Sequence, residues 1–342
     1  LNRLLWGVDD VFNPGLVPPT PHQYIAGIVS HCGDNRAPAL SATRMGGDAN
    51  DRIQNLLGIE DFNGDGRDDI AVGAPSAGSG QGRLYIAYRR EFGGQLDGLE
   101  GDFALNKLTL APDDPQRLDG VLIVSTSLDS LGASLAGGFD FNGDEIGDIA
   151  IGSPTAAGGS GEVLILFGGT GIVSPANGIS VDALLSSTRT ASGGPVATRI
   201  RGNPLDTNGQ FGFNIANAGD IDGDGLDDLL VTAPNATPRF DPTPNDATDA
   251  MTSPGLDLDF DGVQDVVPGD KNLTEAGLVY VIFGSNRLDQ IKTCQDSDTA
   301  CNTSAECPTG KTCGSTNFTI NINQLGKPQL AAYTANRSGH AL

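Results

Sequence analysis

The sequence predicts an all-β protein built from repeated four-stranded units, and three observations support this prediction. A nine-residue acidic segment occurs three times at nearly constant spacing. Short apolar runs rich in β-branched and aromatic residues surround each copy, which is the pattern of strands rather than helices. The chain also has 48 Gly and 20 Pro among 342 residues while 38% are hydrophobic, so it has frequent turns and enough apolar residues for a core. This composition excludes collagen and disordered linkers.

The acidic segment sets the period of the repeat. Its copies are 79 and 80 residues apart, and self-similarity at a fixed spacing is typical of a repeat architecture. The three copies are Asp61-Phe-Asn-Gly-Asp-Gly-Arg-Asp-Asp69, Asp140-Phe-Asn-Gly-Asp-Glu-Ile-Gly-Asp148 and Asp220-Ile-Asp-Gly-Asp-Gly-Leu-Asp-Asp228.

Each repeat contains four predicted strands. One ends in two small residues and Pro directly after the acidic segment, at Ile70–Pro75, Ile149–Pro154 and Leu229–Pro234. The next begins with Gly, at Gly82–Ile86, Gly161–Phe167 and Gly277–Phe283. Another precedes the acidic segment, most clearly at Leu131–Leu135 and Phe211–Ile215, and a last one closes the unit, for example at Ala197–Ile200. Four strands per repeat are typical of a β-propeller blade.

The order Phe-Gly, acidic loop, Gly-Ala-Pro resembles the FG-GAP repeat of the integrin α-chain propeller and its bacterial relatives. The resemblance extends over nearly the whole chain and implies a β-propeller that acts as a structural or adhesive module. Some copies depart from the pattern, because Leu131-Gly132 and Arg52-Ile53 stand in place of Phe-Gly and Glu145 replaces a loop glycine. These departures affect the regularity of the blades rather than the fold.

The repeats divide the chain into about four blade equivalents. We expect three blades at residues 51–125, 126–205 and 206–335, with their acidic loops at 61–69, 140–148 and 220–228. The third blade carries two insertions, at 235–276 and 292–316. Residues 1–50 are expected to form strands two to four of a split blade, whose first strand is 336–342.

The split blade leaves three alternatives open. The strand at 336–342 could pair within its own chain, it could complete the blade of a neighbouring copy and so build a fibre, or the chain could be a piece of a longer propeller. An unpaired sheet edge favours association. We therefore expect this strand to be paired.

The acidic segments have the donors and spacing of calcium loops. Side chains at positions 1, 3, 5 and 9 and the carbonyl at position 7 supply hard oxygen ligands, and small residues at positions 4 and 6 permit a tight turn. An EF-hand would need Glu at position 12, where Val72, Ile151 and Val231 stand instead. The predicted side-chain ligands are Asp61, Asn63, Asp65, Asp69, Asp140, Asn142, Asp144, Asp148, Asp220, Asp222, Asp224 and Asp228, and the predicted backbone ligands are Arg67, Ile146 and Leu226.

A fourth segment, at residues 257–265, has the same spacing inside the first insertion. Its ligands would be Asp257, Asp259, Asp261 and Asp265, with the carbonyl of Val263. Phe260 occupies a position that is small in the other loops. Three carboxylates about 5 Å apart repel one another by roughly 0.8 kcal/mol per pair even in water, so the sequence favours bound Ca²⁺ over empty turns.

Cysteines indicate an oxidising compartment. Cys294, Cys301, Cys307 and Cys313 lie within a polar segment whose spacing does not fit a zinc site, so we expect two disulfides with three possible connectivities. Cys32 is left as a buried thiol or a link to another chain. Disulfides are typical of extracellular proteins. Five glycosylation sequons, at Asn235, Asn272, Asn302, Asn317 and Asn336, agree with that location.

Charge and motifs narrow the function. The net charge of −23 excludes nucleic acid and anionic membrane surfaces as partners, and apolar runs of five or six residues are too short to span a bilayer. The three histidines are far apart and no nucleophile motif occurs, so we expect no enzyme. The expected function is an extracellular, calcium-binding structural or adhesive module that associates with copies of itself, and possible further partners are glycans or another extracellular protein. The alternatives are a carbohydrate-binding or polysaccharide-degrading propeller, which requires an aromatic cluster on one face, and a fragment of a larger adhesin.

Overall fold

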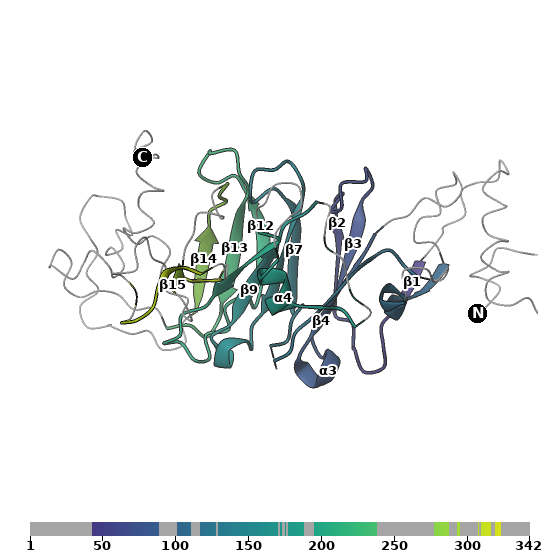
Figure 1. Cartoon of the computed structure of the whole chain (residues 1–342), viewed down its shortest axis with the longest axis horizontal. Coiled ribbons are helices and arrows are strands. Elements are labelled where there is room, and N and C mark those ends of the chain that lie inside the picture. The colour runs from purple at the N-terminus through teal and green to yellow at the C-terminus, as the bar shows by residue number, and fades with distance from the viewer. Residues whose placement is uncertain are drawn as a thin grey trace, which may run out of the picture.

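The computed structural model describes residues 43–88, 101–110, 117–127, 129–169, 172, 175, 177–187, 195–237, 277–286, 293–294, 307, 309–315 and 319–322. These residues form successive antiparallel sheets arranged in a row, with only short helical turns between strands (Figure 1). The all-β prediction is confirmed, and the architecture is that of a β-propeller. The number of blades remains a prediction.

Three sheets correspond to the three complete repeats. The first blade contains β2 (Asn55–Ile59), β3 (Asp69–Ala74), β4 (Arg83–Ala87) and β6 (Gly120–Val124). The second contains β7 (Ser134–Phe139), β8 (Asp148–Ser153), β9 (Glu162–Leu166) and β11 (Ala197–Arg201). The third contains, among the described residues, β12 (Ile215–Gly219), β13 (Asp228–Ala233) and β14 (Leu278–Ile282). Neighbouring strands within each blade are antiparallel, and the acidic loops join the first strand to the second.

The first strand of each repeat starts later than the sequence predicts. β7 begins at Ser134 and β12 at Ile215, whereas the predicted strands began at Leu131 and Phe211. Leu131 and Phe211 instead form isolated parallel bridges to Gly82 and Gly161, at the start of the third strand in the preceding blade. Phe211 is buried there, and the glycine that follows it has a φ of +86°. The Phe-Gly pair therefore joins two blades rather than opening a strand.

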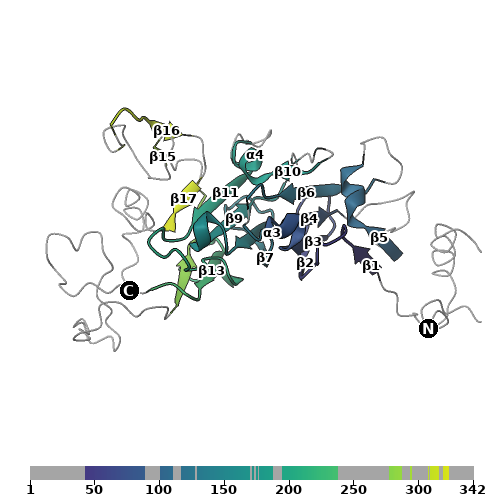
Figure 2. The ribbon, with the colours of Figure 1, turned by 90° about the horizontal axis from the view of Figure 1, so that it is seen from below.

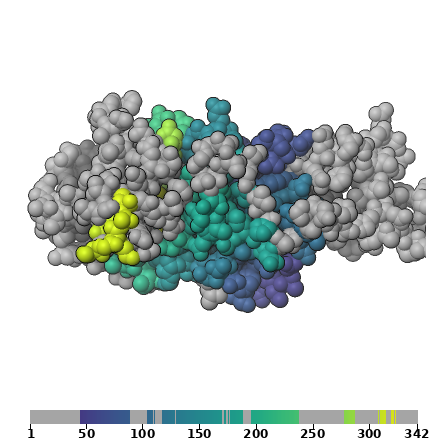
Figure 3. Space-filling model, viewed as in Figure 1, coloured from purple at the N-terminus to yellow at the C-terminus, as the bar shows by residue number. Residues whose placement is uncertain are grey.

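Apolar side chains between blades form the core. Each blade presents a front face to the next blade and a back face to the preceding one. Leu84 and Ile86 on the front of the first blade share a cluster with Ile149 and Ile151 of the second. The same arrangement recurs between the second and third blades. In the space-filling view, the colours follow the chain along the long axis, so blades adjacent in sequence are neighbours in space (Figure 3).

A second connection between blades was not predicted from the sequence. After the third strand, the chain adds a short strand in parallel to the outer strand of the preceding sheet, as Figure 2 shows for β10 beside β6. The three parallel pairs are β5 (Gly101–Ala104) with β1 (Thr43–Gly46), β10 (Ile179–Ser180) with β6, and β17 (Thr319–Asn321) with β11. The short strands β5, β10 and β17, called straps below, cover sheet edges that would otherwise be open to association.

Short helical segments complete the described chain. η1 (Leu105–Thr109) and α4 (Val181–Leu185) follow β5 and β10, and their leucines are buried against the blades. α3 (Ala77–Gly80) and η2 (Ala157–Gly159) are tight turns between the second and third strands. Among the described residues, no helix has the length and hydropathy needed to cross a lipid bilayer.

The cysteine-rich segment contains a small hairpin of β15 (Thr293–Cys294) and β16 (Cys313–Ser315). Cys307 and Cys313 are each disulfide-bonded. Cys301 and Cys32 lie outside the described residues, so the connectivity and the role of Cys32 remain predictions.

Candidate metal centres

The three regular acidic loops lie along one rim of the row of blades, at the upper edge in Figure 1. Each loop connects a first strand to a second strand, so the repeat itself places all three on the same side of the molecule. The fourth predicted loop, residues 257–265, lies outside the described residues. It remains a prediction.

The first aspartate of each loop holds the turn together. Asp140 accepts hydrogen bonds from the backbone N–H groups of Gly143 at 2.7 Å, Asp144 at 3.1 Å and Glu145 at 2.8 Å. Asp61 and Asp220 accept equivalent bonds in their own loops. This turn requires a left-handed residue at position 6, where Glu145 has a φ of 65° while the other loops have glycine. The acidic residue at position 1 therefore shapes the loop before any ion is considered.

The exposed carboxylates differ in number between loops. In the third loop, carboxylate oxygens of Asp220, Asp222 and Asp224 all lie within 4.8 Å of one another and are exposed. The first and second loops have an asparagine at position 3, whose amide donates to Asp65 at 3.2 Å and to Asp144 at 3.1 Å respectively. Arg67 lies 3.8 Å from Asp65 in the first loop, which adds a positive charge there. Among the three described loops, the third therefore brings the most carboxylates together.

The ninth aspartate occupies a different environment from the other acidic residues. Asp148 and Asp228 have no exposed surface, and both oxygens of each accept backbone hydrogen bonds. For Asp228, one donor is Ile221 N at 2.8 Å, in its own loop, and the other is Gly284 N at 2.9 Å, just beyond β14. Asp148 makes the matching bonds to Phe141 and Gly168. In the third loop, Asp228 therefore lies apart from the exposed group of Asp220, Asp222 and Asp224.

Glycines after the third strand are the partners that sequence reasoning missed. A Cβ on Gly168 would lie 2.3 Å from the carbonyl oxygen of Gly147, and one on Gly284 would lie 2.6 Å from that of Asp227. Only glycine fits this close approach. The signal in the sequence was the recurrence of Phe-Gly at the end of two third strands, at residues 167–168 and 283–284.

Hydrogen bonds also join each loop to the neighbouring blade. Gly169 N donates to the carbonyl of Phe62 at 2.7 Å, and Ser285 N donates to that of Phe141 at 2.8 Å. Asp140 N donates to the carboxylate of Asp227 at 3.0 Å, and Asp227 N donates back to the carbonyl of Asp140 at 3.1 Å. The second and third loops are thus bonded directly, and the first loop is bonded to the segment that follows β9.

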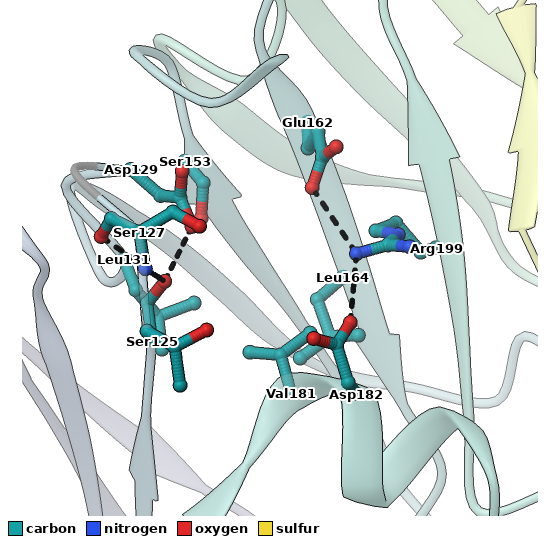
Figure 4. A pocket seen from close by; sticks show the side chains of 11 residues that line it. Ser125, Ser127, Asp129, Leu131, Ser153, Glu162, Leu164, Val181, Asp182 and Arg199 are labelled. Carbon is teal, nitrogen blue, oxygen red and sulfur yellow. Dashed lines mark hydrogen bonds and ion pairs between the residues drawn. The ribbon is translucent and has the colours of Figure 1, made fainter.

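A polar cleft lies on the opposite rim, between the first and second blades. Its cavity measures about 50 Å³. Figure 4 shows Ser125, Ser127 and Asp129 on one wall and Glu162, Arg199 and Asp182 on the other. These charges already pair with one another, since Arg199 lies 3.4 Å from Asp182 and 3.8 Å from Glu162. Arg201 contacts Glu162 at 2.6 Å.

No aromatic side chain lines this cleft. A carbohydrate-binding propeller was expected to show an aromatic cluster on one face. The cleft has no such stacking surface, and no observation among the described residues favours the carbohydrate alternative. Of the predicted glycosylation sites, Asn235 is described and its amide donates to Gln210 at 2.9 Å. Asn272, Asn302, Asn317 and Asn336 lie outside the described residues.

Comparison with known proteins agrees with this geometry. Residues 56–86, 131–166 and 211–249 match the FG-GAP repeat family. The chain is 31% identical over 185 residues to mouse integrin alpha-IIb and 29% identical over 181 residues to human integrin alpha-IIb. These alignments cover 53% and 52% of this chain, but only 15% and 14% of the two integrin chains. The similarity therefore concerns the repeats and not a whole integrin chain.

Proposed function

We propose that this chain, an FG-GAP repeat protein of the integrin α type, is an extracellular, non-enzymatic adhesion module that calcium stabilises and that associates with copies of itself. The similarity to integrin alpha chains supports an adhesion-type propeller. The observation that carries the calcium proposal is the group of three carboxylates in the third loop. Disulfide-bonded Cys307 and Cys313 support an extracellular location.

The donors at the loops fit calcium. Carboxylate, amide and carbonyl oxygens are the ligands that Ca²⁺ takes, and each loop places its donors at positions 1, 3, 5 and 7 on a turn that is already formed. In the third loop these would be Asp220, Asp222, Asp224 and the carbonyl of Leu226. In the other two loops they would be Asp61, Asn63, Asp65 and Arg67, and Asp140, Asn142, Asp144 and Ile146. The buried ninth aspartates Asp69, Asp148 and Asp228 would position these turns.

Bound calcium would supply positive charge that relieves repulsion within each loop. Hydrogen bonds of the loop residues would then carry this stabilisation to the neighbouring blade. Because Asp140 is hydrogen-bonded through its backbone to Asp227, and Phe141 to Ser285, a rigid loop in the second blade also restrains the third acidic loop and the segment after β14. We infer that calcium stabilises contacts between blades as well as the loops themselves. A rigid row of blades suits a module that bears load in adhesion.

Calcium removal tests this proposal. With Kd values of about 10⁻⁴ M and 10 mM Ca²⁺, each site would contribute about 2.7 kcal/mol to the free energy of unfolding. We expect a chelator to lower the melting temperature by several degrees, and added Ca²⁺ to restore it. The measurement is differential scanning calorimetry of the full chain, with Mg²⁺ as a comparison because Mg²⁺ prefers to keep its waters.

A matched variant separates specific binding from a general salt effect. Replacing Asp220, Asp222 and Asp224 together by Asn should remove one calcium from the stoichiometry measured by titration calorimetry. The other two loops serve as internal controls in the same molecule. The calcium proposal would be contradicted if chelation left the melting temperature unchanged and titration showed no calcium bound to the wild type.

A further inference from the structure

The front face of the third blade exposes apolar side chains that are buried in the other two blades. Val279, Val281 and Ile221 are 65%, 42% and 54% exposed. The strand registers identify their counterparts. Val281 pairs with Leu230 in the third blade. In the first and second blades, the equivalent pairs are Ile86 with Ala71 and Ile165 with Ala150. The counterparts are Leu84, Ile86 and Phe62 in the first blade and Val163, Ile165 and Phe141 in the second, and each of these six is at most 1% exposed.

The buried counterparts are covered by the back of the next blade. Leu84 and Ile86 pack against the back face of the second blade. Val163 and Ile165 pack in the same way against Leu229 and Val231 of the third. The molecule therefore contains two examples of what binds to a front face of this type, and in both the occupant is the back of another FG-GAP blade.

The exposed face is apolar along its strands, and acidic side chains border it at the third loop, where Ile221 lies between the exposed Asp220 and Asp222. Its β12 and β14 residues include no acidic or basic side chain, and Asp228 at the start of β13 is buried. Phe283, two residues beyond Val281 on the same side of the chain, is 44% exposed. Exposed apolar side chains gathered on one strand face favour an interaction site. The absence of charge along β12 and β14 matters because two chains of net charge −23 would repel each other through most of their surface.

The opposite end of the row has the remains of a preceding blade. β1 pairs in parallel with β5, as β6 pairs with β10 and β11 with β17. β1 therefore occupies the position of an outer strand in a sheet that precedes the first blade. β1 and β14 lie at opposite ends of the row, so this sheet and the open face do not meet within one copy (Figure 1).

We propose that the front face of the third blade, around Val279 and Val281, binds the back of the N-terminal sheet that contains β1 in a second copy of this chain. The contact is head-to-tail, and repeated use of it builds a ring or a filament. This inference rests on the self-association in the proposed function and names the surface that carries it. Val279 and Val281 lie on β14, outside the acidic loops, so a substitution at either residue tests the contact without changing a proposed calcium ligand.

Mass measurements on the full chain in calcium test the contact. We expect analytical ultracentrifugation of the wild type to show species larger than 35.2 kDa, with the fraction rising with concentration. Val281→Asp should weaken association at least about 10-fold, because a charge would be buried at the centre of the interface. Leu205→Asp is the matched control, since Leu205 is 69% exposed but lies in the turn between β11 and β12 rather than on β14, and it should associate like the wild type.

A photo-crosslinking residue at position 281 identifies the occupant. We expect crosslinks between chains, joined to peptides from residues 1–46. A wild type that stays monomeric at high concentration, crosslinks confined to one chain, or crosslinks between chains that map elsewhere would each overturn the head-to-tail contact. Calorimetry of Val281→Asp with and without calcium separates failure of the contact from failure of the proposed function. If the variant's melting temperature still rises with calcium, the calcium proposal stands whether or not the chains associate.

Discussion

The inner and outer ends of each acidic loop contain the same residue type in opposite environments. At the outer end, Asp220, Asp222 and Asp224 are exposed and lie close together. At the inner end, Asp228 has no exposed surface and accepts two backbone hydrogen bonds. The backbone donors offset the cost of burying Asp228, whereas exposed carboxylates that repel one another gain from a cation. One nine-residue motif therefore combines a folding element with a candidate binding element.

Removing the inner carboxylate should have the largest effect. Asp228→Ala leaves two buried N–H groups without acceptors, so we expect the free energy of unfolding to fall by about 3–5 kcal/mol. Asp224→Ala, in the same loop but exposed, should change it by less than about 1 kcal/mol. Denaturant unfolding in calcium-free buffer measures both. If Asp228→Ala and Asp224→Ala lost equal free energy of unfolding, burial would not distinguish the inner end of the loop from the outer end.

A second buried carboxylate extends the comparison to the back of the first blade. Asp51 is buried, accepts a hydrogen bond from the Tyr85 hydroxyl and lies 3.2 Å from Arg83, while the exposed Asp48 lies 3.0 Å from the same guanidinium. Tyr85→Phe should cost about 1–2 kcal/mol of unfolding free energy at neutral pH, because Asp51 loses a buried donor. Asp48→Asn should cost less than about 1 kcal/mol, as is usual for an exposed ion pair.

The pH dependence of stability provides an independent check on the pair formed by Tyr85 and Asp51. Burial, with the hydrogen bond to Asp51, raises the pKa of Tyr85 to about 12 from its usual 10.0. The folded state therefore holds this proton more tightly than the unfolded chain, and the contribution is fully present below pH 10 and lost as the pH rises toward 12. The stability difference between wild type and Tyr85→Phe should narrow over that window. A constant difference would argue against a buried, neutral hydroxyl.

The last comparison concerns calcium affinity at the outer ends of different loops. Asp222→Asn gives the third loop the asparagine that the second loop already has, and Asn142→Asp makes the reverse change. One carboxylate attracts a doubly charged ion by about 2 kcal/mol at about 4 Å in water, so calcium affinity should fall or rise about 30-fold at the altered loop. Isothermal titration calorimetry measures the change. Loss of affinity in both variants would show that side-chain geometry outweighs charge.

The sequence alone was sufficient to predict the repeat, the all-β class and the position of most strands. These features depend on local patterns, namely alternating apolar residues and turn-forming glycines, that are readable one repeat at a time. It also predicted that side chains at positions 1, 3, 5 and 9 of each loop would converge, and in the third loop the carboxylates at positions 1, 3 and 5 lie together while Asp228 is buried.

Only the tertiary structure decided how the repeats contact one another. The ninth aspartates turn inward because their partners Gly168 and Gly284 come from a different strand, and the straps β5, β10 and β17 pair with the preceding sheet across long stretches of chain. The Phe-Gly pair bridges two blades for the same reason. Such contacts depend on how the sheets stack. The spacing of residues within one repeat does not encode which residue of the next sheet will face a given side chain.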